Sequence, residues 1–237
     1  MEKANLDAIF SSFSRGVAHR GLHDETRPEN SKAAFENAIR EGLPFETDIH
    51  LTADHRLIVN HDHELGRVTG KGGLIEELTL DQIKEGYRLK DGSELMEIGE
   101  LISLWGEKVP MVLEIKEYFG NGEEIKNALN PILDAVKDPS KLVLISFSQN
   151  ALRAWKSDRW NRGLLIGGGE IDKISALDEW EFLDVDFTLL KDPRFLAYRE
   201  KGGKILSWTI HDDWSLGIAK KNSDAMTFEL ISPSKVH

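Results

Sequence analysis

Two stretches near the start of the chain decide its fold: residues 17–30, VAHRGLHDETRPEN, and residues 45–62, FETDIHLTADHRLIVNHD. Each opens with an apolar segment of strand character and ends in charged residues. Residues 31–42 between them have the apolar spacing of an amphipathic helix. A strand, a helix and a second strand in succession indicate a parallel sheet. Charged residues that follow such strands then gather at one edge of that sheet.

Glu46 and Asp48 lie two positions apart in the strand FETDI, so both side chains point to the same face. Neighbouring carboxylates repel each other, and burial of either one costs free energy. A divalent cation removes both costs. Because these ligands are hard oxygens and the chain has no cysteine, Mg²⁺ or Ca²⁺ is favoured over zinc. The pair alone is equally compatible with a strand whose acidic face points to solvent.

VPMVLEIK at residues 109–116 is a second apolar run that ends in charge, and it predicts a strand buried on both faces. Glu114 and Lys116 share a face by the same alternation. The carboxyl ends of strands are where α/β barrels place their chemistry. Glu114 can therefore supply a third carboxylate to the metal, and Lys116 a cation for a bound anion. The alternative is a simple Glu–Lys pair on the surface.

His19 and His61 each follow a short apolar stretch, Val17-Ala18 and Leu57-Ile58-Val59. Histidine titrates near neutral pH and can take or give a proton during turnover. The guanidinium of Arg20 presents a planar fork suited to phosphate oxygens. A single histidine is more often structural. Two histidines, an arginine and three carboxylates at strand ends together indicate a catalytic site.

Taken in order, the motifs of the chain resemble the glycerophosphodiester phosphodiesterase family. They are HRG at 19–21, PEN at 28–30, ETD at 46–48, NHD at 60–62, LGRVTGKGG at 65–73 and LEIK at 113–116. The resemblance is close over the first half of the chain and loose over the second. It implies a TIM barrel, related to bacterial phosphatidylinositol-specific phospholipases C. It also implies hydrolysis of deacylated phospholipids to glycerol 3-phosphate and an alcohol.

The resemblance also implies roles for individual residues. In such a mechanism the 2-hydroxyl of the substrate glycerol attacks phosphorus, and water then opens the cyclic phosphate. His19 and His61 would exchange the roles of general base and general acid. Glu46, Asp48 and Glu114 would hold one divalent cation, Mg²⁺ before Ca²⁺. Arg20 and Lys116 would neutralise the phosphate. Glu29 would orient Arg20 or reach the metal shell. Trp208, on a later strand, would line the substrate pocket, although a strand tryptophan is more often part of the core.

The rest of the chain predicts one α/β domain over residues 1–237, a TIM (β/α)8 barrel. Strands are expected at 16–18, 45–49, 57–60, 109–116, 142–147, 164–169, 183–187, 204–210 and 225–231, with helices at 6–13, 31–42, 79–83, 98–105, 123–136, 150–156, 193–200 and 212–221. The chain stops too soon after the last strand for an eighth helix, so the helix at 6–13 is a candidate to cover that part of the barrel. Residues 62–73 form an irregular insertion after the second strand, either a lid or an ordinary surface loop.

Composition limits the partners. The chain has 237 residues, a hydrophobic fraction of 40%, a net charge of −11 and a pI of about 5.2. This balance argues against nucleic acid or an anionic membrane as a partner. The absence of cysteine excludes disulfides and thiol catalysis. The first residues lack the features of a signal peptide, and no apolar run has membrane-spanning length, so we expect a cytoplasmic protein acting on a small phosphodiester.

The last strand departs from the family pattern. The family usually ends this strand in Thr-Asp followed by Pro, whereas this chain reads TFELISP at residues 227–233. The pocket for the alcohol can therefore differ. The alternatives are a phosphodiesterase acting on a phosphosugar or inositol diester, and a barrel that binds a phosphorylated ligand without cleaving it. The sequence leaves the oligomeric state and the choice between Mg²⁺ and Ca²⁺ open.

Overall fold

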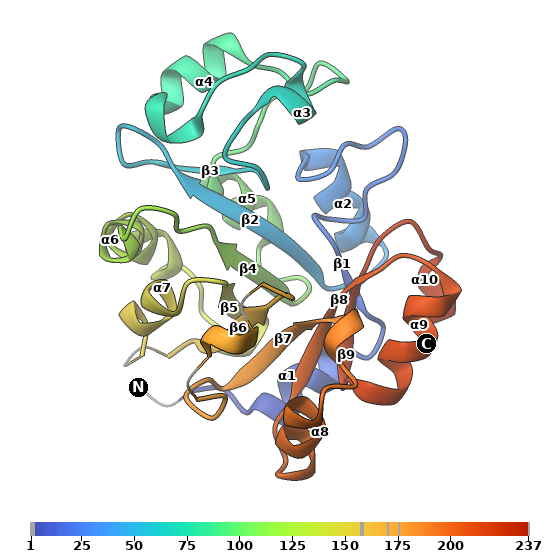
Figure 1. Cartoon of the computed structure of the whole chain (residues 1–237). Helices are drawn as coiled ribbons and strands as arrows, with labels where there is room; N and C mark the ends of the chain where they lie inside the picture. The colour runs from blue at the N-terminus through green and yellow to red at the C-terminus, as the bar shows by residue number, and fades with distance from the viewer. Residues whose placement is uncertain (1–2, 157–158, 170, 175, 237) are drawn as a thin grey trace.

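A closed barrel of eight parallel strands lies at the centre of the structure (Figure 1). The computed structural model describes residues 3–156, 159–169, 171–174 and 176–236. The barrel strands are β1 (Val17–Ala18), β2 (Phe45–Leu51), β4 (Met111–Ile115), β5 (Leu142–Ser146), β6 (Asn161–Ile166), β7 (Phe182–Asp186), β8 (Ile205–Ile210) and β9 (Ala225–Phe228). Because β1 pairs with both β2 and β9, the sheet closes on itself. The predicted TIM barrel is confirmed.

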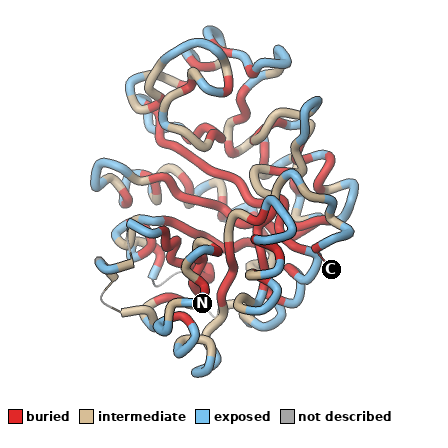
Figure 2. Tube along the Cα trace, turned by 45° about the vertical axis from the view of Figure 1, so that its right-hand side comes forward, coloured by how far each residue is buried: buried red, intermediate tan, exposed pale blue. Residues whose placement is uncertain are grey.

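Helices cover the outside of the barrel, and the strands at its centre are buried almost throughout (Figure 2). These helices are α2 (Lys32–Arg40), α5 (Ile98–Trp105), α6 (Gly122–Leu133), α7 (Gln149–Ala154), α8 (Pro193–Glu200) and α9 (Asp213–Asn222), with short 3₁₀ turns η2 (Pro139–Lys141) and η4 (Phe187–Leu189). Ser31 caps α2, since its hydroxyl accepts from the Ala34 amide. Within the described ranges, no helix combines the length and apolarity needed to cross a membrane.

The predicted insertion at residues 62–73 is part of a larger insertion that spans residues 57–86 and forms a separate layer, at the top of Figure 1. It begins with β3 (Leu57–Val59), an extra strand that pairs antiparallel with β2. It continues with α3 (Gly66–Thr69), η1 (Ile75–Glu77) and α4 (Leu80–Gly86). These elements share a separate apolar cluster, which includes Ile75 and Ile83. The insertion is therefore packed structure, and it holds His61 directly after β3.

Two connections depart from strict alternation. Between β6 and β7, the described residues form only the 3₁₀ turn η3 (Ile171–Lys173) and no α-helix. After β9 there is one helical turn, α10 (Pro233–Val236), where a full barrel would have its eighth helix. Val236 in that turn is buried. It lies close to Phe228 of β9, because both side chains border the same backbone position, Gly16.

Helix α1 (Leu6–Ser12) closes the amino-terminal end of the barrel. Ile9, Phe10 and the following Phe13 are buried against inward-facing side chains, among them Phe182 at the start of β7. The rings of Phe10 and Phe182 meet edge to face with centroids 5.5 Å apart. The helix thus covers the barrel end and not the place of the missing eighth helix. The opposite, carboxyl-terminal end of the barrel is left open and holds the candidate catalytic residues.

Candidate active site

The nine residues singled out from the sequence converge at the carboxyl-terminal end of the barrel. Six of them line one cavity: His19, Arg20, Glu46, His61, Glu114 and Trp208. Asp48 and Lys116 contact Glu114 or its neighbours, and Glu29 contacts Arg20. The strand ends of β1, β2, β4 and β8 and the turn after β3 position these side chains. The closed sheet therefore brings these nine residues to one end of the barrel.

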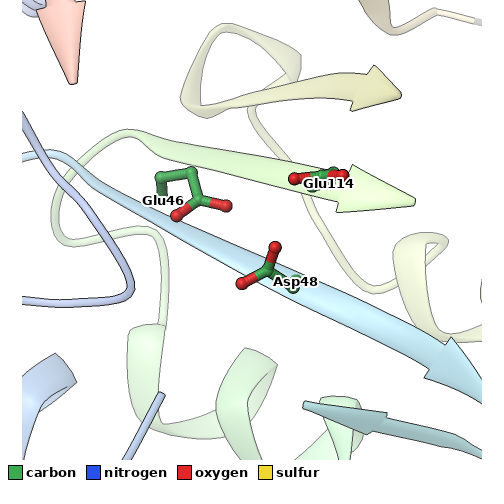
Figure 3. A group of neighbouring side chains, drawn as sticks. All are labelled: Glu46, Asp48 and Glu114. Atoms are coloured by element: carbon green, nitrogen blue, oxygen red, sulfur yellow. The ribbon is translucent and has the colours of Figure 1, made fainter. Parts of the chain in front are cut away.

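Glu46, Asp48 and Glu114 form a buried acidic triad (Figure 3). One carboxylate oxygen from each lies within 4.8 Å of the others. Asp48 of β2 is the register partner of Glu114 of β4, so adjacent strands hold the two at one level. Both β2 acids are buried, which rules out the solvent-facing alternative for this strand. The predicted alternation therefore brings three oxygen ligands together inside the barrel.

The positive groups around the triad do not fully balance its three carboxylates. Burial first, and then the charges of Asp48 and Glu114, raise the pKa of Glu46 well above its usual range. Burial raises the pKa of Glu114 to about 7, against the opposing charge of Lys116. Asp48 differs, because the positive charges near it, Lys116 foremost, overcome the effect of burial and lower its pKa. An excess of buried carboxylate suits a bound divalent cation.

Lys116 lies between two members of the triad. Its Nζ is 3.0 Å from Asp48 Oδ1 and 2.7 Å from Glu114 Oε1, and the side chain is buried. Burial would lower the pKa of Lys116, but the two carboxylates raise it above its usual value, so the ammonium is charged. The Glu114–Lys116 pair is thus part of the interior and not a surface pair.

His19 is held by a carboxylate from the other end of the chain. Its Nδ1 is 2.6 Å from Glu229 Oε2, directly after β9, while Nε2 points toward Glu46 Oε2 at 3.9 Å. The turn after β1 depends on Gly21, which has φ +80° and would place a Cβ 2.9 Å from that of Ala34. Burial lowers the pKa of His19, although the hydrogen bond with Glu229 opposes this effect.

His61 has the same kind of support. Its Nδ1 is 2.6 Å from Asp62 Oδ1, and Asp62 also accepts from Arg67 Nε. The main-chain carbonyl of His61 accepts from Nε2 of the fully buried His50 at 3.0 Å. His50 Nδ1 in turn lies 3.1 Å from Glu76 Oε1 in the insertion. Burial lowers the pKa of His61. Asp62 thus orients the ring of His61, and His50 holds its main chain.

Arg20 is oriented by Glu29, as one of the predicted roles of Glu29 requires. Arg20 donates a hydrogen bond to Glu29 Oε1 at 2.7 Å. Arg67 donates one hydrogen bond to each carboxylate oxygen of Glu29, both at 2.7 Å. Asn30, the next residue of the PEN motif, donates to Asp48 Oδ2 at 3.0 Å. The motif therefore ties the loop after β1 to the acidic triad and to the insertion.

The second wall of the cavity is largely apolar. It is formed by Ile145, Phe147, Leu165, Asp184, Trp208, Thr209 and Thr227. Trp208 donates from Nε1 to the main-chain oxygen of Asp184 at 3.1 Å and meets Phe147 edge to face. It is partly exposed to the cavity and does not belong wholly to the core.

The sequence pointed to no role for Glu229, Asp62 or Glu76, and it suggested His50 only as a residue of the barrel interior or a neighbour of the site, outside the catalytic set. Asp62 has a local signal, since it directly follows His61 in the NHD motif. Glu229 has a weaker one: it is the acid at the end of the altered last strand. Nothing in the sequence connects His50 with Glu76, because they lie 26 residues apart across an irregular insertion.

The chain matches known proteins of one family over most of its length. A model of the glycerophosphoryl diester phosphodiesterase family matches residues 19–230. A glycerophosphodiester phosphodiesterase of Caldanaerobacter subterraneus subsp. tengcongensis is 31% identical over 216 residues, covering 82% of this chain and 84% of that protein. A probable glycerophosphodiester phosphodiesterase 1 of Mycobacterium tuberculosis is 32% identical over 176 residues, which is 65% of this chain but only 63% of that relative.

The fold has close counterparts among solved structures. A phosphodiesterase of Oleispira antarctica, in complex with the product sn-glycerol-3-phosphate, superposes with a TM-score of 0.82 at 23% identity, covering 96% of this chain and 97% of that one. At this identity the likeness speaks for the fold. Together with the family match, it shows that the chain belongs to the glycerophosphoryl diester phosphodiesterase family.

Proposed function

We propose that the chain is a metal-dependent phosphoric diester hydrolase that releases sn-glycerol 3-phosphate from glycerophosphodiesters. The observation that carries the proposal is a single cavity lined by both His19 and His61 together with Glu46 and Glu114. Proton-transfer groups and a cation site then face the same bound phosphodiester. Family membership, and the names of the relatives described above, support the same substrate class.

Glu46, Asp48 and Glu114 would hold one divalent cation. Three carboxylate oxygens without sulfur or imidazole suit Mg²⁺ first and Ca²⁺ second. When bound there, the ion supplies positive charge to the phosphoryl oxygens and lowers the pKa of a coordinated hydroxyl. Lys116 and Arg20 border the same site and add positive charge for the phosphate. Glu29 keeps the Arg20 guanidinium in place.

The two histidines would carry the protons. In the first step, the 2-hydroxyl of the glycerol gives its proton to one histidine and attacks phosphorus. The other histidine gives a proton to the oxygen of the departing alcohol, which leaves a cyclic phosphate. In the second step the roles reverse, and water opens the ring to yield glycerol 3-phosphate. An internal nucleophile makes this step fast because it is already positioned.

The geometry of both imidazoles fits this exchange. Each binds a carboxylate through Nδ1, Glu229 for His19 and Asp62 for His61. A carboxylate on Nδ1 fixes the ring and stabilises its charged form, as in other acid–base pairs. Nε2 of each ring is then the atom that exchanges protons with substrate. Burial lowers the pKa of both rings, so the neutral, basic form is populated at neutral pH.

The test is turnover by two single variants, His19→Ala and His61→Ala, on glycerophosphocholine. We expect a loss of more than about a hundredfold in kcat for each, with an unchanged melting temperature. His55→Ala is a matched control, since that histidine is exposed on the turn between β2 and β3. Near-full activity in both variants would refute the proposal. Cleavage of phosphosugar or inositol diesters alone would keep the chemistry and change the substrate. Ligand binding without any cleavage would favour a non-catalytic barrel.

A further inference from the structure

The wall of the cavity opposite the acidic triad holds polar groups that the proposed chemistry does not use. Ile145, Leu165 and Trp208 make this wall apolar. Asp184 on β7 and Thr227 on β9 interrupt it, one on each side of the strand that carries Trp208. Asp184 is 1% exposed and Thr227 is 2% exposed. Neither belongs to the acidic triad.

Asp184 Oδ1 and Thr227 Oγ1 are both buried without a hydrogen-bond partner among the described residues. An unpartnered buried polar group destabilises the fold, so native proteins keep few of them. A ligand that enters this cavity can recover the cost by offering hydrogen bonds at these two positions. Two such atoms in the lining of one cavity, on either side of β8, therefore point to a polar group of the ligand.

The protonation state of Asp184 indicates which polar group of a ligand would bind here. Burial, and then the charge of Glu114, raise the pKa of Asp184 well above its usual range, which favours the neutral carboxyl. A neutral carboxyl both donates and accepts, and so does the Thr227 hydroxyl. Neither would bind a second cation or an anion strongly. A hydroxyl group, which also donates and accepts, is the matching partner.

Resting on the proposed function, the structure assigns Asp184 and Thr227 to the free primary hydroxyl of the substrate's glycerol. That hydroxyl takes no part in the proposed bond changes, which use the 2-hydroxyl. It is present in every glycerophosphodiester, whatever the alcohol. The pair would thus make this chain select glycerol over shorter 2-hydroxyalkyl groups. It would not contact the alcohol on the other side of phosphorus and would not discriminate between alcohols.

Two substrates separate this role from the chemistry. Glycerophosphocholine carries the primary hydroxyl. Its analogue 2-hydroxyethyl phosphocholine keeps the attacking hydroxyl and lacks only the CH₂OH group. The variants are Asp184→Leu and Thr227→Val, with Asp184→Asn as the conservative replacement that still donates and accepts. Thr188→Val is the matched control, because Thr188 is exposed just after β7 and bonds only Asp186.

We expect the unaltered chain to prefer glycerophosphocholine by about 10- to 1000-fold in kcat/KM. Asp184→Leu and Thr227→Val should each reduce kcat/KM for glycerophosphocholine by about 10-fold or more and leave the analogue within about twofold. Asp184→Asn should keep most of the preference. Equal losses on both substrates, or no preference in the unaltered chain, would overturn the assignment.

Calorimetric binding separates this inference from the proposed function. The probes are sn-glycerol 3-phosphate and 2-hydroxyethyl phosphate, which need no turnover. If neither diester is cleaved, the proposed function fails. Tighter binding of glycerol 3-phosphate that disappears in Asp184→Leu would still support the hydroxyl site. Equal binding of the two probes would refute it.

Discussion

The imidazole of His19 and the carboxylate of Glu229 are 2.6 Å apart, although 210 residues separate them in the chain. Closure of the barrel accounts for the contact, since β1 and β9 are hydrogen-bonded neighbours. The His19 amide also donates to the Phe228 carbonyl at 2.9 Å. The last strand, whose sequence departs from the family pattern, therefore supplies the group that orients a candidate catalytic histidine.

Replacement of Glu229 by Gln should slow turnover without weakening binding. The carboxylate stabilises the imidazolium of His19, so its loss lowers the pKa of that ring further. We expect kcat to fall by about a hundredfold, KM to change little, and the acid limb of the pH profile to move to lower pH. The control is Glu25→Gln, at an exposed site in the loop after β1. An unchanged acid limb would show that Glu229 has no effect on His19.

The melting temperature of the protein should depend on whether a divalent cation occupies the acidic triad. Mg²⁺ or Ca²⁺ at about 100 times Kd should stabilise the fold by roughly 2.7 kcal/mol, measured as a rise in melting temperature. Glu46→Gln should abolish that rise. In EDTA the same variant should melt higher than the unaltered chain at pH 7, because it removes a buried carboxyl with a raised pKa. The control is Glu36→Gln on the exposed face of α2. A full metal response in Glu46→Gln would place the ion elsewhere.

Asp184→Asn should stabilise the fold in a pH-dependent way. The pKa of Asp184 is raised in the folded state, so the unaltered chain loses stability relative to the variant as pH rises above the unfolded value of about 3.9. Below that value both states bind the proton and the difference vanishes. The melting temperature of Asp184→Asn should therefore exceed that of the unaltered chain by an increasing margin as the pH is raised from 4 to 8. A constant difference across this range would mean that Asp184 does not titrate with folding.

Helix α1 should contribute to stability through its apolar face. Phe10 is buried against Phe13 and Phe182 at the closed end of the barrel. Phe10→Ala should cost about 3–5 kcal/mol in urea unfolding. Ser11→Ala, on the exposed side of the same helix, should change stability by less than about 0.5 kcal/mol. A loss for Phe10→Ala no larger than for Ser11→Ala would mean that α1 does not close the barrel.

The apolar runs made much of the fold predictable. VLEI and LVLIS are strands because strands buried on both faces need continuous apolar residues, and FETDI placed its acids on one face by simple alternation. Strand β6 was harder, since it begins at Asn161 and not at Leu164. Arg162 within it is buried, and its main ion-pair partner Glu181 lies 19 residues away in the sequence.

The candidate site was predictable as a set of residues and not as a network. The motifs gave the histidines and the triad, whereas contacts across the closed barrel, such as Glu229 with His19, depend on strand order. Lys116 was expected at the phosphate, and its position between Asp48 and Glu114 could not be read from LEIK. The unpartnered atoms of Asp184 and Thr227 appear only once the cavity is known.

Release of sn-glycerol 3-phosphate from glycerophosphocholine and glycerophosphoethanolamine by the purified protein is the decisive assay. It is run with EDTA, and again after Mg²⁺ or Ca²⁺ is restored. The account predicts release from both diesters that EDTA abolishes and one of the two ions recovers. Release that EDTA leaves unchanged would contradict the metal site, and no release from either diester with metal bound would contradict the substrate.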